Sequence, residues 1–284
     1  MEEVDSVLNE RFSSTLVDQS SGYNTTATEV AQPLLLVYAH TIYQIIKHVR
    51  PEISFDYSLG HSLGEYSAYS TAGVLSIADA VWLVRQRGLA MKNVTDNYIK
   101  RTGNEIAMVA LFAPSDQYAQ QINQFIQSSY PNELSLAIFN APSQIVLSGS
   151  RKAIDALIQH LDGKVKTKDL NVSGPFHSPI MAEAQTTMRQ ILESNKITFN
   201  WPPTNDIVSN ISAKPIQNLD EVKASIVDTL VEPVHWSQSF DYLVNNGVSS
   251  VISVGLGKYA RNATPSKDIN FVYLMSPDSV NKLA

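Results

Sequence analysis

Apolar positions in the first hundred residues recur at two different spacings, and this change predicts a mixture of helices and strands. The run Pro33–Val49 is strongly apolar, and a proline at its start suits the first turn of a buried helix. The short, β-prone run Ile53–Leu59 predicts a strand. A helix is predicted over Glu65–Thr71, where Gly73 ends it, and a second helix over Ile77–Val94 begins after a capping-box-like serine.

Between residues 104 and 172 the order becomes strand, helix, strand, strand, helix, strand. The predicted strands are Glu105–Ala113, Leu134–Asn140, Gln144–Gly149 and Lys164–Val172, and the predicted helices are Ser115–Ser129 and Arg151–Leu161. This is the order of the split, ferredoxin-like βαββαβ unit, and it fits in one contiguous insert. We therefore expect a small subdomain of residues 104–172, inserted into a body formed by residues 1–103 and 173–284.

Strands and helices also alternate after the insert. The predicted helices are Ser178–Ser194, Leu219–Leu230 and Trp236–Asn246, and the predicted strands are Ile197–Asn200, Asp206–Asn210 and Val248–Gly255. The stretch from Pro265 onward has weak periodicity and predicts a peripheral strand or a tail. Such alternation indicates an α/β fold whose body holds a mostly parallel sheet flanked by helices on both faces.

Composition narrows the possible functions. The 284 residues contain no cysteine, which excludes a disulfide framework, a thiolate metal site and a cysteine nucleophile. The net charge of −6 argues against nucleic acid as a partner. The absence of an apolar run of about 18 residues argues against a membrane span, and the acidic N-terminus does not resemble a targeting segment. We find neither a glycine-rich phosphate motif nor a metal-ligand cluster, so no cofactor is expected.

The most informative motif is Gly60-His61-Ser62-Leu63-Gly64, between a predicted strand and a predicted helix. Serine becomes a nucleophile when a sharp turn exposes it and a base takes its proton, and flanking glycines permit that turn. The start of the following helix also presents free N–H groups to an oxyanion. The alternative is a serine in an ordinary strand–helix turn.

A nucleophilic serine needs a proton acceptor, and the chain has six histidines: His40, His48, His61, His160, His177 and His235. His177 lies in Gly174–Pro179, a rigid loop where the chain returns from the insert to the body. Loops held by a scaffold often carry catalytic side chains, so His177 is the candidate base. His61 precedes Ser62, and its side chain is expected to project away from the serine.

The run Gly60–Gly88 closely resembles the malonyl-CoA:acyl-carrier-protein transacylases, an acyltransferase family of fatty acid and polyketide synthesis. The other matching motifs, in the family's order, are Gln32-Pro33, Asn140–Gln144, GPFHSPIM around His177, Pro233–Trp236 and Val254–Lys258. The resemblance covers about Thr15 to Thr264. It implies a hydrolase-like α/β body that carries a ferredoxin-like subdomain, in agreement with the periodicity.

The resemblance also implies a mechanism. Ser62 would attack the thioester of malonyl-CoA, and His177 would take its proton and later assist the thiol of an acyl carrier protein, in two half-reactions. A backbone carbonyl near Thr229 would orient the imidazole, so no aspartate is required. Arg87, which lies 25 residues after Ser62, would bind the free carboxylate of the malonyl group with two parallel hydrogen bonds.

Three further residues are expected at the substrate site by the same resemblance: Gln32 of the Gln-Pro motif, Leu63 and Phe176. The Phe176 ring would crowd an α-methyl group and so disfavour methylmalonate, although simple core packing explains it equally well. The alternative for Arg87 is a surface charge like that of Arg85.

The chain departs from the family in one respect, because we find no strand that ends in a Phe-Pro-Gly-Gln-Gly loop. On this ground we expect a late start relative to the family, with Leu63 N–H as the remaining oxyanion donor and weak activity. Two other functions stay open. One is a serine hydrolase, in which water replaces the carrier thiol, and the other is an inactive binding module.

A carrier protein is typically acidic, so a chain of net charge −6 must offer it a local basic patch. The candidates are Arg151, Lys152, Lys164, Lys166 and Lys168, which could equally form a solvated face. We expect a monomer. The GPFH motif favours a mitochondrial location, with the bacterial cytoplasm as the alternative.

Overall fold

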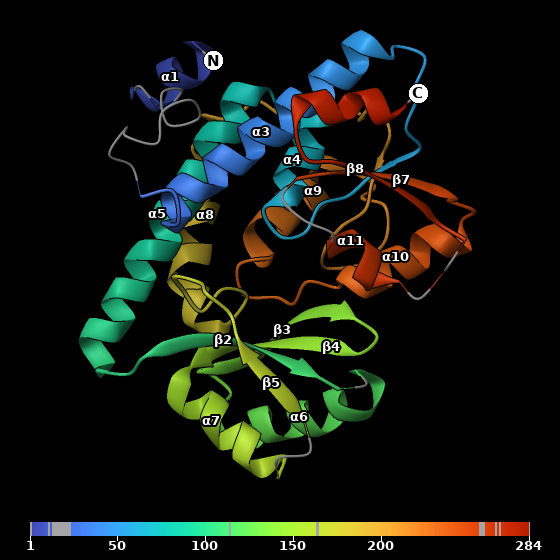
Figure 1. The fold of residues 1–284 in the computed structure, drawn as a ribbon. Helices are drawn as coiled ribbons and strands as arrows, with labels where there is room; N and C mark the ends of the chain where they lie inside the picture. The colour runs from blue at the N-terminus through green and yellow to red at the C-terminus, as the bar shows by residue number, and fades with distance from the viewer. Residues whose placement is uncertain are drawn as a thin grey trace.

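The structure is a computed structural model that describes residues 2–10, 12, 24–113, 115–162, 165–255, 259–264, 266 and 268–283. Figure 1 shows a helix-rich body above a smaller unit in which helices α6 and α7 lie beneath a sheet. The body helices are α1 (Glu2–Leu8), α3 (Thr28–Val49), α4 (Gly64–Thr71), α5 (Ile77–Thr102), α8 (Ala182–Glu193), α9 (Leu219–Asp228), α10 (Trp236–Asn245) and α11 (Tyr259–Ala263). The described part of the body also has two 3₁₀ segments, η1 (Pro179–Met181) and η2 (Pro277–Leu283).

The smaller unit has the predicted βαββαβ order. It comprises β2 (Ile106–Phe112), α6 (Ser115–Ser129), β3 (Leu134–Ala141), β4 (Gln144–Ser150), α7 (Arg151–His160) and β5 (Lys166–Asp169). Its strands pair antiparallel in the order β3-β4-β2-β5, as in ferredoxin-like units. One face of the sheet packs on α6 and α7, for example through Leu147, while Val146 on the other face packs against the body.

The body contains parallel strands, but they form two separate pairs. β1 (Tyr57–Ser58) pairs with β6 (Asp206–Ile207), and β7 (Ser250–Val254) pairs with β8 (Asn270–Leu274). Among the described strands no hydrogen-bonded ladder joins the two pairs, so the expected single parallel sheet is divided. The peripheral strand expected after Pro265 is present as β8.

The strand predicted over Ile197–Asn200 is not formed. Only Phe199 makes an isolated antiparallel bridge, to Leu75. Pro202 and Pro203, which follow closely, have no N–H groups with which to extend a ladder, so the pairing stays local.

The first long helix, α3, begins at Thr28, five residues before the predicted start, and Pro33 lies inside it. Proline removes the N–H that would bond to the carbonyl of Glu29, four residues earlier. Arg85 of α5 supplies the missing donor, because its Nη1 lies 2.7 Å from Glu29 O. The two helices approach closely there, since a Cβ on Gly88 would lie 2.5 Å from Glu29 Cα.

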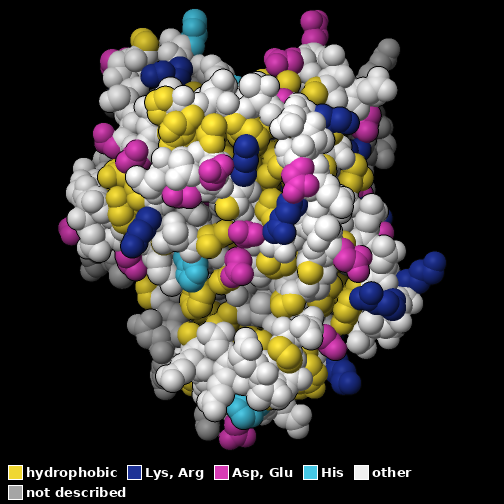
Figure 2. Space-filling model, turned by 180° about the vertical axis from the view of Figure 1, so that it is seen from behind, with side chains coloured by type: hydrophobic (Ala, Val, Ile, Leu, Met, Phe, Trp, Pro, Cys, Tyr) yellow, Lys and Arg dark blue, Asp and Glu magenta, His cyan; other side chains and the backbone are white. Residues whose placement is uncertain are grey.

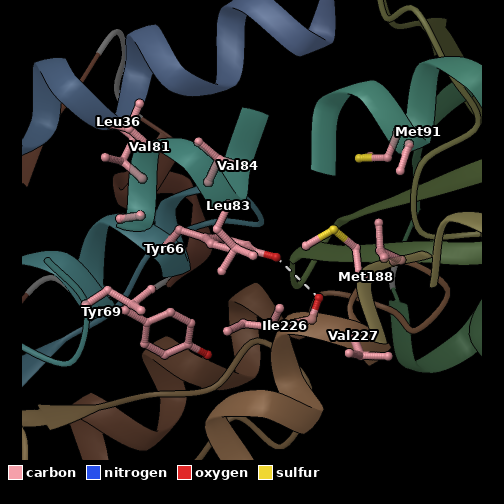
Figure 3. Close-up of a cluster of buried hydrophobic side chains, with 14 of the residues drawn as sticks. Leu36, Tyr66, Tyr69, Val81, Leu83, Val84, Met91, Met188, Ile226 and Val227 are labelled. Carbon is pink, nitrogen blue, oxygen red and sulfur yellow. Dashed lines mark hydrogen bonds between the residues drawn. The ribbon is translucent and has the colours of Figure 1, made fainter. Parts of the chain in front are cut away.

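Helix α5 is longer than predicted, continuing past Val94 to Thr102. The apolar stripe includes Tyr98, which is buried, and the helix ends only at Gly103, whose φ of 68° is left-handed. Figure 3 shows the core that results, in which side chains of α3, α4, α5, α8 and α9 meet. This core fixes α4, which follows the turn with Ser62, and α5, which carries Arg87.

Candidate active site

Ser62 stands on a sharp turn between β1 and α4. Its φ of 52° is left-handed, a conformation that a non-glycine residue rarely adopts. The turn brings Gly60 so close to Gly64 that a Cβ on Gly60 would lie 2.0 Å from the carbonyl carbon of Gly64. A Cβ on Gly64 would meet nothing within 4 Å, so the close approach requires a glycine at position 60 but not at position 64. The structure thus has the predicted strand–turn–helix elbow.

The side-chain amide of Asn210 holds this turn. Its Oδ1 accepts the Ser62 backbone N–H at 2.8 Å, and its Nδ2 donates to Gly60 O at 2.7 Å. The sequence analysis missed Asn210. A sequence signal existed, because Asn210 lies at the end of a predicted strand, and parallel strands bring their carboxyl ends to one edge.

His177 is the histidine that the structure places against Ser62. Its Nε2 lies 2.8 Å from Ser62 Oγ, and its Nδ1 lies 2.5 Å from the carbonyl oxygen of Thr229. A carbonyl only accepts, so Nδ1 carries the proton and Nε2 is free to accept one from the serine. The Thr229 carbonyl therefore orients the ring, as the family resemblance implied, and no carboxylate within the described residues contacts it.

Burial keeps this imidazole neutral. His177 is 2% exposed, and desolvation together with the nearby Arg87 lowers the pKa of His177 from 6.5 to about 3. Its backbone is also left-handed, with a φ of 58°, and Ser135 of β3 donates to its carbonyl at 2.6 Å. The small unit thus helps to hold the loop that presents the candidate base.

Arg87 lies beside the serine and is buried. Its Nη2 donates to Ser62 Oγ at 3.3 Å, and its Nη1 donates to Gln32 Oε1 at 2.6 Å. Gln32 is itself held by Thr28, whose Oγ1 is 2.7 Å from Gln32 Nε2. Arg87 Nε has no partner within the described residues. The guanidinium thus has an unused N–H donor, Nε–H, on the same edge as the Nη2 that contacts the serine.

The surroundings of Arg87 act on its charged form in two opposite directions. The guanidinium carbon lies 5.6 Å from the ring centroid of Tyr66, whose hydroxyl donates to the carbonyl of Ile226 (Figure 3). Burial lowers the pKa of Arg87, and the negative forms of Tyr66 and Glu65 act in the opposite direction. The surface-charge alternative for Arg87 is excluded, since only 2% of the residue is exposed.

The other two predicted substrate-site residues, Leu63 and Phe176, are chain neighbours of Ser62 and His177. Leu63 is the N-cap residue of α4, so its N–H is at the helix end that follows the serine. The ring of Phe176, next to His177, packs on Gly174, where a Cβ would lie 2.5 Å from Phe176 Cε1. Phe176 contacts both the buried cluster inside the body and the one where the body meets the small unit.

Other histidines are engaged elsewhere. The ring of His61 lies edge-on to Trp236 at 5.2 Å, and desolvation lowers the pKa of His61 to about 4. His40 bonds to Ser70, and His235 stacks on Phe139. His160 contacts the ring of Phe125, and His48 is exposed. The ring contact of His61 is with Trp236, and the histidine bonded to Ser62 Oγ is His177.

Of the basic candidates, Lys166 and Lys168 lie exposed on β5, while Arg151 is paired with Asp155 and Asp169. Lys152 is exposed on α7. Lys164 lies outside the described residues, as do Leu256, Gly257 and Lys258 of the last motif. Within the described ranges there is no cluster of three metal-ligating side chains, and no helix is long and apolar enough to cross a membrane.

A serine, a neutral imidazole and a cation that meet in this way can carry out acyl transfer through an acyl-serine, with preference for an acid-bearing acyl group. Comparisons with known proteins agree with this chemistry. The family model described as "Acyl transferase domain" matches residues 2–256. A malonyl CoA-acyl carrier protein transacylase of Bacillus subtilis (strain 168) is 32% identical over 259 residues, which are 90% of this chain and 78% of the relative.

Two solved structures illustrate the shared fold. FabD from Acinetobacter baumannii superposes with a TM-score of 0.87 at 24% identity, covering 99% of this chain and 87% of that one. A malonyl-transacylase solved in complex with a type II PKS acyl-carrier protein (PlMCAT:AntF) gives 0.85 at 23% identity, covering 99% and 88%. Both likenesses confirm the α/β fold expected from the sequence.

Proposed function

The chain belongs to the acyl transferase domain family, and we propose that it transfers a malonyl group from malonyl-CoA to the phosphopantetheine thiol of an acyl carrier protein in fatty acid synthesis. One observation carries the proposal beyond family membership. Ser62 Oγ lies between His177 Nε2, at 2.8 Å, and the buried Arg87 Nη2, at 3.3 Å. A base and a carboxylate-binding cation thus adjoin one hydroxyl.

In the first half-reaction, Ser62 Oγ attacks the thioester carbon while His177 Nε2 takes the hydroxyl proton. The C–S bond then breaks, His177 returns the proton to the departing CoA sulfur, and malonyl-Ser62 remains. In the second half-reaction, His177 takes the proton of the carrier thiol, and the sulfur attacks the ester carbonyl. The bond between the acyl carbon and Ser62 Oγ breaks, and His177 returns the proton to Ser62 Oγ.

Two groups near the reacting carbonyl support the proposal. We assign Leu63 N–H, at the start of α4, to the oxyanion that forms in each half-reaction. The helix N-terminus adds partial positive charge at the same place. The Thr229 carbonyl stabilises the imidazolium that forms when His177 holds the proton.

Arg87 is proposed to bind the free carboxylate of the malonyl group through its Nε and Nη2. Gln32 would fix the guanidinium from the opposite edge, because Nη1 is already bonded to its Oε1. Phe176, next to His177, is proposed to limit the space around the α-carbon of the acyl group. Together these residues would select malonyl over acetyl and methylmalonyl groups.

The carrier protein would dock on the edge of the small unit, which we propose to be a subdomain of residues 104–172. In β5, Lys166 pairs with Phe112 and Lys168 pairs with Ala110, so both lysines are on the sheet face that packs against the body. Phe112 is 41% exposed there. Elsewhere, on the face seen in Figure 2, Lys and Arg side chains are dispersed among Asp and Glu.

We also propose that the protein acts as a monomer in the mitochondrion, with the cytoplasm as the alternative location. The location rests on the resemblance of Gly174–His177 to mitochondrial family members. Light scattering at assay concentration tests whether the protein is a monomer. Fractionation of the source cells, with immunodetection of this chain beside a matrix marker and a cytoplasmic marker, tests the location.

The function is tested by supplying malonyl-CoA together with a carrier protein that bears its phosphopantetheine arm. Transfer predicts malonyl-carrier in amounts equal to the CoA released, measured by mass spectrometry. A serine hydrolase would release CoA and free malonate with no malonyl-carrier. An inactive binding module would release no CoA above the level of a Ser62→Ala control.

A further inference from the structure

The nucleophile of this site is held in an unfavourable backbone conformation by another part of the chain. A left-handed serine persists only where its surroundings over-determine it. Helix α4 contributes the bonds from Gly64 N–H to His61 O and from Glu65 N–H to Ser62 O, on the C-terminal side of the turn. The N–H of Ser62 itself is held from outside, by Asn210.

A primary amide suits this position because the turn presents one donor and one acceptor. Asn210 Oδ1 accepts a hydrogen bond from the Ser62 N–H, and Asn210 Nδ2 donates one to the Gly60 carbonyl. One side chain therefore bonds to the elbow at two residues. Asn210 is 2% exposed, so water cannot easily replace either bond. A carboxylate of the same shape would keep the first bond but place an oxygen against the Gly60 carbonyl.

Asn210 is anchored in turn. Val208 N–H donates to Ser58 O, which extends the parallel β1–β6 pairing, and His235 N–H donates to the Asn210 carbonyl. Glu65 Oε2 lies 3.4 Å from Asn210 N. These contacts fix the segment that carries the amide.

The buried carboxyl of Glu65 also reaches the helix that orients the base. Its Oε1 accepts from Tyr69 and from Ser225, each at 2.7 Å. Ser225 belongs to α9, and Thr229, whose carbonyl bonds to His177, caps the C-terminus of that helix. Glu65 therefore connects the elbow, Asn210 and the support of the imidazole.

We propose that Asn210, anchored by Glu65, is a positioning residue that keeps Ser62 Oγ aligned with His177 Nε2. The inference rests on the proposed role of Ser62 as the nucleophile. It does not depend on the malonyl group, because the alignment matters for any electrophile that the serine attacks. Misplacement of a reacting group by about 1 Å can cost about 100-fold in rate.

The test compares Asn210→Ala and Asn210→Asp with the parent chain, and uses Asn205→Ala as the matched control. Asn205 is half-buried on the same segment and bonds to Ser58 Oγ, so its loss removes an amide without touching the elbow. Each variant is treated with a fluorophosphonate probe, which labels a base-activated serine, and separately with saturating malonyl-CoA in a single turnover. Malonyl-CoA affinity is measured in the Ser62→Ala background, with and without Asn210→Ala.

We expect both rates to fall about 100-fold in Asn210→Ala and to fall in Asn210→Asp, with Asn205→Ala unchanged and malonyl-CoA affinity within about threefold. If Asn210→Ala does not fold, Asn210→Asp and Glu65→Gln carry the same expectation, since the amide introduced by Glu65→Gln would turn an N–H donor toward Asn210 N–H. Probe labelling of Asn210→Ala within about threefold of the parent, or an equal loss in Asn205→Ala, would overturn the proposal. Labelling of the parent without malonylation would refute the substrate and still test Asn210.

Discussion

Ser62 Oγ and His177 Nε2 lie 2.8 Å apart, although 115 residues separate them and each has a left-handed backbone. The two strained residues belong to different supports. Ser62 is held by the β1–α4 elbow and Asn210, while His177 is held by Thr229 of the body and Ser135 of the small unit. Their alignment therefore depends on how the small unit sits on the body, and not on either loop alone.

Replacing His177 by alanine should remove the base while leaving Arg87 and the elbow in place. Single-turnover malonylation at neutral pH should slow by about 10²–10⁴, the range expected for loss of general base catalysis. Stopped-flow measurement of CoA release checks this, with His48→Ala, an exposed histidine, as the control. A rate within about threefold of the parent would require another base.

Arg87→Ala should change the substrate preference. Malonyl-CoA would lose charge-assisted hydrogen bonds worth about 1.5–3 kcal/mol, or roughly ten- to a hundredfold in kcat/KM. Acetyl-CoA has no carboxylate and should lose much less, so the ratio of the two kcat/KM values reports the effect. Arg101→Ala, an exposed arginine on the same helix, should leave the ratio unchanged. Equal losses for both substrates would make Arg87 purely structural.

The lowered pKa values of two histidines predict that the protein loses stability as the pH falls below 6.5. Desolvation lowers the pKa of His177 to about 3 and that of His61 to about 4, from 6.5. Below pH 6.5 these histidines bind protons in the unfolded chain but stay neutral in the folded chain. The free energy of unfolding therefore decreases as the pH falls. The raised pKa of Glu65 increases the free energy of unfolding as the pH falls. This contribution is the same in two proteins that differ only at a histidine, so their difference does not contain it.

That comparison is urea unfolding of the parent chain and of His61→Gln at about pH 7.5 and pH 5.5. The parent should lose about 1.4 kcal/mol more than the variant over this interval, because one histidine no longer titrates. Parallel changes in the two proteins would show that His61 titrates normally in the folded state.

Reversing the charge of Lys166 and Lys168 to glutamate should impair the second half-reaction only. The two lysines share a face at the edge of the sheet, so repulsion of an acidic carrier should lower its kcat/KM by about tenfold at low salt, and less at high salt. Malonylation of Ser62 should be unaffected. Lys152→Glu, on α7 across the sheet, is the matched control. An equal loss in that variant would place the carrier elsewhere.

The order of elements could largely be predicted, because alternating apolar and polar positions report burial directly. The limits of α3 could not, since the carbonyl that Pro33 leaves free accepts a bond from Arg85 of another helix, and the local sequence does not reveal that contact. The short length of β1 could not be predicted either. After Ser58 the chain turns into the elbow, which begins at Gly60, and the two strand pairs of the body remain separate.

At the candidate site, the elbow motif predicted Ser62, the rigid loop predicted His177 and the family resemblance predicted Arg87, whereas the contacts that hold them had no periodic signal. Asn210 reaches Ser62 across 148 residues through parallel pairing of β1 with β6, and Gln32 reaches Arg87 through the packing of α3 on α5. Such pairs depend on tertiary structure, which a single sequence does not reveal.

The most direct measurement is the mass of the intact protein after brief exposure to malonyl-CoA without a carrier, followed by mapping of the modified peptide. The account predicts one malonyl group per chain, on Ser62, which is discharged when carrier protein is added. The Ser62→Ala variant should gain no mass. An adduct of equal yield in that variant, mapped to another residue, or a parent chain that never becomes malonylated, would contradict the account.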